Sequence, residues 1–206
     1  MPTLKLDDVQ TGTEELLPYD GSAILYRDFV EAHEASRLFE ELLDSTDWES
    51  RNIVIFGKEV AEPRLSAWHS VDNRPYTYSG LTRESHSWTP LLQALSTQCE
   101  KVAKSPFNSV LVNLYRSGRD AMGWHADNER ENGKEPVIAS VSLGAERRFD
   151  LRHRDTKHTV RTPLPHGSLL VMSGLTQHKW VHQVPRTAKV NEPRINLTFR
   201  WVHDLA

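Results

Sequence analysis

A run of short, strand-like segments fills the second half of the chain and restricts the folds open to it. Each segment is three to nine residues long, rich in branched and aromatic side chains, and bounded by Gly, Pro or charged residues. The segments are 110–115, 137–143, 147–152, 158–160, 168–172, 180–184 and 194–202. Many short strands at regular spacing are typical of a β-sandwich or a double-sheet roll. We therefore predict such a roll over about residues 107–203.

The first half of the chain predicts two helices. Between residues 31 and 43, apolar side chains recur at steps of three and four with charges between them, the pattern of an amphipathic helix lying on a core. A second helix is expected from Pro90, in a first turn where its missing N–H costs nothing, through Val102. Two helices before a run of strands indicate an α+β, mostly β fold with the helices packed on one side of the roll.

Shorter elements are expected around these helices. Residues 1–21 are polar and predict a loosely held arm, followed by a short strand that starts at Ser22. A hairpin is predicted over residues 52–60, with Phe56 at or near its tip or, alternatively, in the core. Two more strands are expected at 65–69 and 76–79, joined by a polar loop.

Length and composition indicate one soluble domain. A chain of 206 residues buries a sizeable core, and its net charge of −3 gives no argument from bulk charge for nucleic-acid binding. The lone Cys99 excludes an intramolecular disulfide and suits a reducing compartment. No apolar run approaches the roughly 20 residues of a membrane span, and the N-terminus lacks a signal-peptide pattern. We expect an intracellular monomer, cytoplasmic or, in a eukaryote, nuclear, without a membrane partner.

The sequence His125-Ala126-Asp127 sets an imidazole and a carboxylate side by side on one strand or strand end. Non-haem Fe(II) oxygenases complete such a pair with one distant His, and the resulting triad leaves coordination positions open. The chain has ten His residues, so the pair needs support from elsewhere. His182 in a strand-like segment and His178 in a turn-like region are the candidates for the third ligand. A rigid strand preorganises a ligand better than a loop does, which favours His182.

The last predicted strand separates polar from apolar side chains, because side chains alternate along a strand. One face carries Arg194, Asn196, Thr198 and Arg200, and the other carries Ile195, Leu197 and Phe199. Two guanidinium groups on the inner face of a roll require anions. A dicarboxylate such as 2-oxoglutarate would satisfy both, since each guanidinium can bind one carboxylate through two hydrogen bonds. The alternative is an outward face with solvated arginines.

Six motifs stand in a specific order along the chain. They are Asn113-Leu114-Tyr115, His125-x-Asp127, residues 139–145, residues 165–170, Trp180-x-His182-x-x-Pro185 and residues 193–200. In this order they closely resemble the AlkB family of Fe(II)- and 2-oxoglutarate-dependent nucleic-acid dealkylases. The resemblance covers roughly residues 52–202, and the chain looks most like the animal DNA- and RNA-repair homologues.

The resemblance implies one Fe(II)/2-oxoglutarate dioxygenase domain over residues 1–206 with a double-stranded β-helix, or jelly-roll, core. Its parts would be an N-terminal arm (about 1–21), a nucleotide-recognition lid of hairpins (about 50–82) and the catalytic roll (about 107–203). The implied Fe(II) ligands are His125, Asp127 and His182. The implied 2-oxoglutarate residues are Asn113, Tyr115, Arg194, Asn196 and Arg200, with Arg194 on the distal carboxylate and Arg200 and Asn196 near the carboxylate that chelates iron.

The activity that the resemblance implies is oxidative demethylation of bases of the 1-methyladenine and 3-methylcytosine type. The partner would be alkylated DNA, with RNA as a second substrate; O₂ and 2-oxoglutarate are consumed, and succinate, CO₂ and an aldehyde are released. The damaged base must leave its stack and lie between flat side chains. Tyr76 and Tyr78 match the family's lid strand, and Glu129 matches an acidic position near the exocyclic group of the base. The alternatives are ordinary strand aromatics and a solvated carboxylate.

Residues 55–58 resemble the hairpin with which the double-strand-preferring homologue inserts an aromatic finger into the stack, and Phe56 would be that finger. Residues 64–68 look closer to the relative that acts on single strands and RNA, so the strand preference stays open. Phosphate contacts are expected from a set of basic residues, namely Lys101, Lys104, Arg147, Arg148, Arg152, His153, Arg154, Lys157, His158 and Arg161.

Two other functions are compatible with the sequence. An enzyme with the same iron site would hydroxylate a protein or a small molecule, and would have no basic rim around its pocket. A non-catalytic damage-binding module would have lost activity, and the intact ligand and arginine set argues against it.

Overall fold

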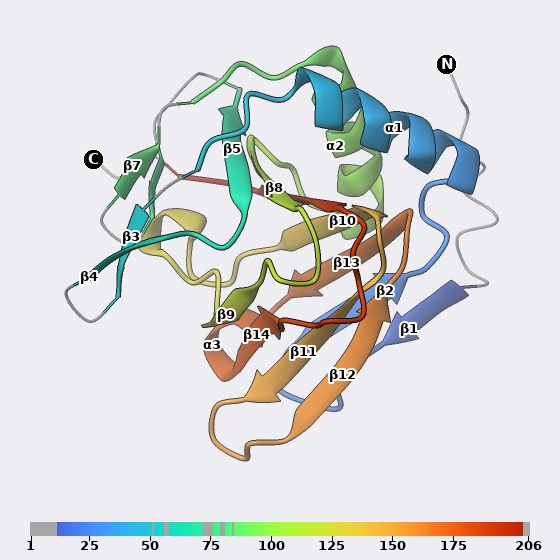
Figure 1. The fold of residues 1–206 in the computed structure, drawn as a ribbon. Coiled ribbons are helices and arrows are strands. Elements are labelled where there is room, and N and C mark those ends of the chain that lie inside the picture. The colour runs from blue at the N-terminus through green and yellow to red at the C-terminus, as the bar shows by residue number, and fades with distance from the viewer. Residues whose placement is uncertain are drawn as a thin grey trace.

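The computed structural model describes residues 12–50, 52–55, 58–71, 76–78, 81–83 and 85–203, and of residues 52–61 and 76–83 it describes the backbone alone. Within these ranges two antiparallel sheets form the core (Figure 1). The predicted mostly β roll with helices on one side is confirmed.

The major sheet has the strand order β1-β2-β13-β10-β15-β8-β5. Its strands are β1 (Thr13–Glu15), β2 (Ser22–Tyr26), β13 (Ser168–Ser173), β10 (Ile138–Gly144), β15 (Arg194–Arg200), β8 (Ser109–Tyr115) and β5 (Leu65–Ser70). The minor sheet has the order β12-β11-β14-β9. Its strands are β12 (Thr159–Leu164), β11 (Arg147–His153), β14 (Trp180–Val184) and β9 (Met122–His125).

Helices α1 (Ala32–Ser45) and α2 (Pro90–Ala103) lie together on the outer face of the major sheet (Figure 1). Thr89 caps α2 by accepting a hydrogen bond from the N–H of Leu92, and Pro90 occupies the first turn as predicted. Buried side chains of both helices form one apolar cluster with strands β8, β10, β13 and β15. The cluster fixes the outer face of β15, so the opposite face of that strand must point between the sheets.

The described part of the predicted N-terminal arm, residues 12–21, forms ordered structure. Strand β1 pairs with β2, and Leu16 and Leu17 are buried in the apolar cluster between the sheets. Further along, the Trp180 indole N–H donates to the carbonyl oxygens of Tyr19 and Asp20. The sequence did not predict these contacts of the arm, because they involve single apolar residues and main-chain carbonyl groups that form no periodic pattern.

Two small hairpins follow α1. Strands β3 (Asn52–Ile55) and β4 (Lys58–Ala61) pair as the predicted hairpin, and β6 (Tyr76–Tyr78) pairs with β7 (Leu81–Arg83), a strand that the sequence did not predict. Phe56 lies outside the described residues, as do the side chains of Tyr76 and Tyr78. Among the helices that the structure describes, none is long and apolar enough to cross a bilayer.

Candidate active site

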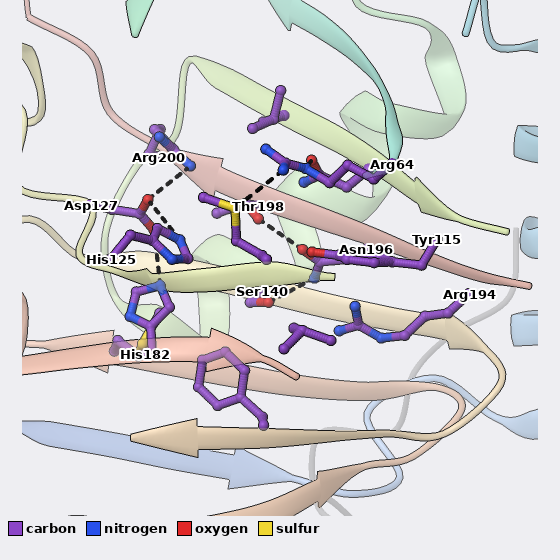
Figure 2. Close-up of a pocket in the computed structure, with 16 residues that line it drawn as sticks. Arg64, Tyr115, His125, Asp127, Ser140, His182, Arg194, Asn196, Thr198 and Arg200 are labelled. Carbon is purple, nitrogen blue, oxygen red and sulfur yellow. Dashed lines mark hydrogen bonds and ion pairs between the residues drawn. The ribbon is translucent and has the colours of Figure 1, made fainter. Parts of the chain in front are cut away.

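A pocket lies between the two sheets (Figure 2). The major sheet contributes side chains from β8, β10, β13 and β15, and the minor sheet contributes side chains from β9, β11 and β14. The lining residues are Arg64, Leu111, Asn113, Tyr115, Met122, His125, Asp127, Ser140, Phe149, Met172, His182, Val184, Arg194, Asn196, Thr198 and Arg200. All eight residues expected to bind iron or 2-oxoglutarate are in this set.

His125, Asp127 and His182 meet at one end of the pocket. His125 ends β9, and its register partner across the sheet is His182 on β14. Pairing of these two strands places the centroids of the two rings 4.3 Å apart. Asp127 follows two residues after His125. One nitrogen or oxygen atom from each of the three residues lies within 4.8 Å of the other two, close enough for one ion to bind all three.

Hydrogen bonds and burial set the protonation states that a metal requires. The Nδ1 atom of His125 lies 2.8 Å from the carbonyl oxygen of Gly123, which identifies Nδ1 as the protonated nitrogen and leaves Nε2 as a free lone pair. Burial lowers the pKa of both imidazoles, that of His182 to about 3. Burial opposes ionisation of Asp127, but the positive charge of Arg200, 3.7 Å away, holds the pKa of this carboxyl below its usual value.

Two neutral imidazoles and one carboxylate around a shared centre fit a divalent cation such as Fe(II). The distances from the Asp127 carboxylate oxygens to the Nε2 atoms of His125 and His182 are 4.0 and 3.9 Å. No bond between the three groups satisfies these lone pairs, so the residues present fit the metal. The ring of Phe149 stacks on His182 with centroids 5.3 Å apart and fixes its orientation.

Strand β15 supplies the other part of the pocket. Arg194, Asn196, Thr198 and Arg200 all point between the sheets, and Ile195, Leu197 and Phe199 pack under the helices, as the alternation predicted. Both arginines are only 2% exposed. Figure 2 shows Arg200 beside Asp127 and Arg194 beside Tyr115 at the opposite end of the pocket.

Arg194 has unused hydrogen-bonding capacity. Its Nη2 donates to the Ser142 hydroxyl at 2.9 Å, while Nε and Nη1 are buried without a hydrogen-bond partner among the described residues. Burial lowers the pKa of Arg194 to about 10, and Tyr115 opposes this shift; the guanidinium still stays charged at neutral pH. A buried cation with idle donors fits a carboxylate, which accepts hydrogen bonds from a guanidinium.

The remaining predicted residues lie between these two ends. Asn196 donates to the Ser140 hydroxyl and the Val141 carbonyl oxygen, and Thr198 donates to the Asn196 side-chain oxygen, so the amide is held in one orientation. Asn113 accepts a hydrogen bond from Arg64 at 2.8 Å. The polar wall therefore continues from Arg194 to the metal end.

Comparison with known proteins agrees with this geometry. The 2OG-Fe(II) oxygenase superfamily matches residues 22–200. The human DNA oxidative demethylase ALKBH2 is 39% identical over 180 residues, which cover 82% of this chain and 69% of that protein. This chain belongs to the AlkB family. The human alpha-ketoglutarate-dependent dioxygenase alkB homolog 3, a further member, is 40% identical over 189 residues, or 87% of this chain and 65% of its own length.

The chain thus spans just under two thirds of the length of the alkB homolog 3 proteins. Among solved structures, OsALKBH1 has a TM-score of 0.63 at 18% identity, covering 92% of this chain and 99% of that chain. At this identity the likeness shows the shared AlkB fold alone.

Several lining residues of this AlkB-family pocket were not predicted. Arg64 precedes β5, is 4% exposed, and donates to Asn113 and towards the Met122 sulfur. Glu62 lies 3.7 Å from it. No local pattern marks Arg64, because only the pairing of β5 with β8 brings it against Asn113. The other unpredicted lining residues are apolar, and the sequence pattern indicated only that they belong to the core. They are Leu111, Met122, Phe149, Met172 and Val184.

The other histidine and acidic candidates are placed as follows. His178 is exposed on the short helix α3 (Thr176–Lys179), with its ring against the Lys134 carbonyl oxygen, and takes no part in the pocket. Glu129 is half-buried just before the 3-10 turn η2 (Arg130–Asn132). Burial raises the pKa of Glu129, Arg200 opposes this shift, and Asn132 donates to its carboxylate at 2.8 Å.

Part of the predicted phosphate-binding set is wrong. Arg147 is 2% exposed and donates to the carbonyl oxygens of Ser117, Asp120 and Pro185, so it ties two loops together. His153 is also buried, with Nε2 3.2 Å from an Asp20 carboxylate oxygen. On β11 both lie on the same side of the strand as the buried Phe149 and Leu151, whereas Arg148 on the other side is exposed. The exposed residues of the set on β11, β12 and the turn between them are Arg148, Arg154, Lys157, His158 and Arg161.

Proposed function

We propose that this chain is an Fe(II)- and 2-oxoglutarate-dependent oxidative demethylase of N-alkylated bases in DNA, with RNA as a second substrate. The observation that carries the proposal is the pocket itself. A ligand set for a divalent cation and a buried arginine with idle donors stand at opposite ends of one cavity, joined by a continuous polar wall.

The residues of the pocket would divide the work. His125, Asp127 and His182 would hold the iron on one face and leave its other positions open. Arg194 would bind the distal carboxylate of 2-oxoglutarate, with Tyr115 and Asn113 beside it. Asn196 and Arg200 would lie along the part of the co-substrate nearer the metal. When bound, iron and 2-oxoglutarate supply the oxidant that converts an N-alkyl carbon to an aldehyde, with succinate and CO₂ as the other products.

The positive charge of Arg200 would also act on two neighbouring carboxyl groups. Its Nη2 lies 3.7 Å from an Asp127 oxygen, so its charge keeps that carboxylate ionised, and the same charge opposes the rise in the pKa of Glu129.

The buried wall of apolar residues, including Phe149 and Val184, keeps water away from the reacting atoms.

The choice of substrate rests on the relatives and on the lid. The relatives include proteins named as DNA oxidative demethylases. Tyr76, Tyr78 and Glu129 would contact the extruded base, and Phe56 would fill the gap that the base leaves in a duplex. The assignment covers residues 1–206 as one domain, with an arm at 1–21, a lid at about 50–82 and the catalytic roll at about 107–203, acting as an intracellular monomer.

Coupled turnover tests the proposal. The protein is supplied with Fe(II), 2-oxoglutarate and O₂ and given an oligonucleotide that carries 1-methyladenine or 3-methylcytosine. We expect one succinate and one aldehyde for each base restored, and loss of all three in Asp127→Ala. Asn128→Ala, which changes an exposed neighbour, is the matched control and should retain turnover.

The same assay separates the other functions. Metal and 2-oxoglutarate binding without turnover of any methylated oligonucleotide would replace the proposal with a hydroxylase of another substrate. Oligonucleotide binding without 2-oxoglutarate binding would indicate a damage-binding module.

A further inference from the structure

The main chain of Asp127 is held by a side chain from a distant part of the sequence. The backbone N–H of Asp127 donates to Oε1 of Gln177 at 2.9 Å. Gln177 lies on α3, fifty residues further along the chain, and its side chain is completely buried. A buried amide at this position is not needed for packing, since an apolar side chain would fill the space without a polar group to satisfy.

Asp127 requires an anchor of this kind. Strand β9 ends at His125, so Asp127 has no place in a β-ladder that would fix its backbone. Its N–H bonds to Gln177, and its carbonyl oxygen lies 3.4 Å from Nδ2 of Asn132 on the other side. The main chain of Asp127 is thus held by two buried side-chain amides, one at its N–H and one at its carbonyl oxygen.

The orientation of the Gln177 amide is determined by its two neighbours. Oε1 faces the Asp127 N–H, and Nε2 faces the Met172 sulfur at 3.6 Å. The reverse orientation would place an NH₂ group against an N–H group. Only the orientation with Oε1 towards Asp127 satisfies both contacts.

Gln177 also links two of the proposed metal ligands. It lies five residues before His182, and α3 leads directly into β14, which carries His182. The hydrogen bond therefore joins the segment of Asp127 to the segment of His182, from opposite sides of the site. We propose that Gln177 is a positioning residue that fixes the distance between these two ligands and so raises the affinity of the site for a divalent cation. This inference rests on the metal site of the proposed function.

Metal affinity, measured without turnover, tests this role. Mn(II) is titrated into the metal-free 206-residue chain by calorimetry, in the absence of 2-oxoglutarate and O₂. Residues that orient metal ligands typically change the affinity by about 10- to 100-fold when they are replaced, and we expect a rise of Kd in this range for Gln177→Leu. Gln177→Asn keeps the amide but shortens its reach and should weaken binding similarly.

A neighbouring residue provides the matched control. Thr176 is equally buried on the same short helix, and its hydroxyl bonds to Ser22 on β2 and not to Asp127. Thr176→Val should lower the melting temperature, as a change in packing would, yet leave the Kd for Mn(II) within about 2-fold of wild type.

The outcomes separate this inference from the function on which it rests. If the wild-type protein does not bind Mn(II), the metal site itself is refuted. If wild type binds and Gln177→Leu and Gln177→Asn bind equally well, the positioning role is overturned. It is also overturned if Thr176→Val weakens binding as much as they do. Should Gln177→Leu fail to fold, Gln177→Asn decides, because it keeps a neutral amide and loses only the reach to Asp127.

Discussion

The two ends of the pocket are built in different ways. At the 2-oxoglutarate end, the proposed ligand-binding residues stand on β15 and on its neighbour β8, and each of these strands has a paired neighbour on both sides. At the metal end, His125 stands on β9, an edge strand of the minor sheet, and Asp127 stands beyond the end of that strand. The main-chain ladder fixes one end, and individual side chains fix the other.

The difference teaches where each end is vulnerable. Strand β9 meets β14 in two register pairs with an irregularity between them, which is a weak ladder. Arg152 on β11 reaches across β14 to stack on Trp124 of β9, 4.2 Å from the ring centre, and Gln177 holds Asp127. Changes to surrounding side chains should therefore disturb metal binding, whereas 2-oxoglutarate binding should depend on the residues that contact it directly.

Removal of the carboxylate should have the largest effect. Asp127→Ala takes away one of three ligands and its charge, and we expect the Kd for Mn(II) to rise by more than the roughly 100-fold upper range for orienting residues. Calorimetry on the metal-free protein measures the change, with Asn128→Ala as the control. Metal affinity within 10-fold of wild type would show that Asp127 is not a ligand.

Arg194→Met should have the next largest effect, confined to the co-substrate end. Loss of a buried charged partner costs about 2–5 kcal/mol of binding, so the Kd for 2-oxoglutarate should rise at least ~30-fold while Mn(II) affinity stays unchanged. The melting temperature of the ligand-free protein should not fall, because Met removes a buried charge with two idle nitrogens.

The control for this variant is Arg161→Met, an exposed arginine on β12. If both variants weakened the binding of 2-oxoglutarate equally, the net positive charge of the protein, and not contact with Arg194, would account for the affinity.

Acid should destabilise the metal end of the ligand-free protein. Burial lowers the pKa of His182 to about 3, whereas an imidazole in the unfolded chain titrates near 6.5. Between these values the unfolded chain binds more protons, so the free energy of unfolding decreases as the pH falls from about 6.5 towards 3. One such site contributes up to about 1.4 kcal/mol per pH unit.

Melting temperatures of wild type and His182→Leu between pH 7.5 and 5 check this sign. We expect the wild type to lose more stability over this range than the variant. Parallel curves for the two proteins would contradict the lowered pKa of His182.

The smallest effect is expected for Arg152→Ala. A stacked cation and ring contribute about 0.5–1 kcal/mol at a partly exposed site, so looser attachment of β9 should raise the Kd for Mn(II) by about 2- to 5-fold. The 2-oxoglutarate end should not respond to it. Arg154→Ala, on the exposed turn after β11, is the control. If Arg152→Ala also weakened the binding of 2-oxoglutarate, the contrast between the two ends would be contradicted.

The contrast also explains how much the sequence could predict. Strand β15 was predicted with both of its faces, since alternation is a local rule and its apolar residues define the core side. His182 was favoured over His178 because it lies on a strand, and the structure brings it to His125. Helices α1 and α2 followed from their periodic apolar residues and the proline at the start of α2.

Long-range contacts account for the rest. Gln177 and Arg64 act through partners about fifty residues away, and no local pattern marks either of them. Arg147 was assigned to phosphate binding because it lies in a basic segment, although it alternates with the exposed Arg148 and shares the inward face with Phe149. The same rule that succeeded on β15 would have placed Arg147 inside.

The most direct test of the central claim, that the two ends form one site, is the effect of metal on 2-oxoglutarate affinity. Binding of 2-oxoglutarate is measured by calorimetry without O₂, with and without saturating Mn(II), in wild type and in Asp127→Ala. We predict that Mn(II) lowers the Kd for 2-oxoglutarate at least about 10-fold in wild type, that 2-oxoglutarate tightens Mn(II) by the same factor as linkage requires, and that the coupling disappears in Asp127→Ala. The same Kd for 2-oxoglutarate with and without metal in the wild-type protein would contradict the account.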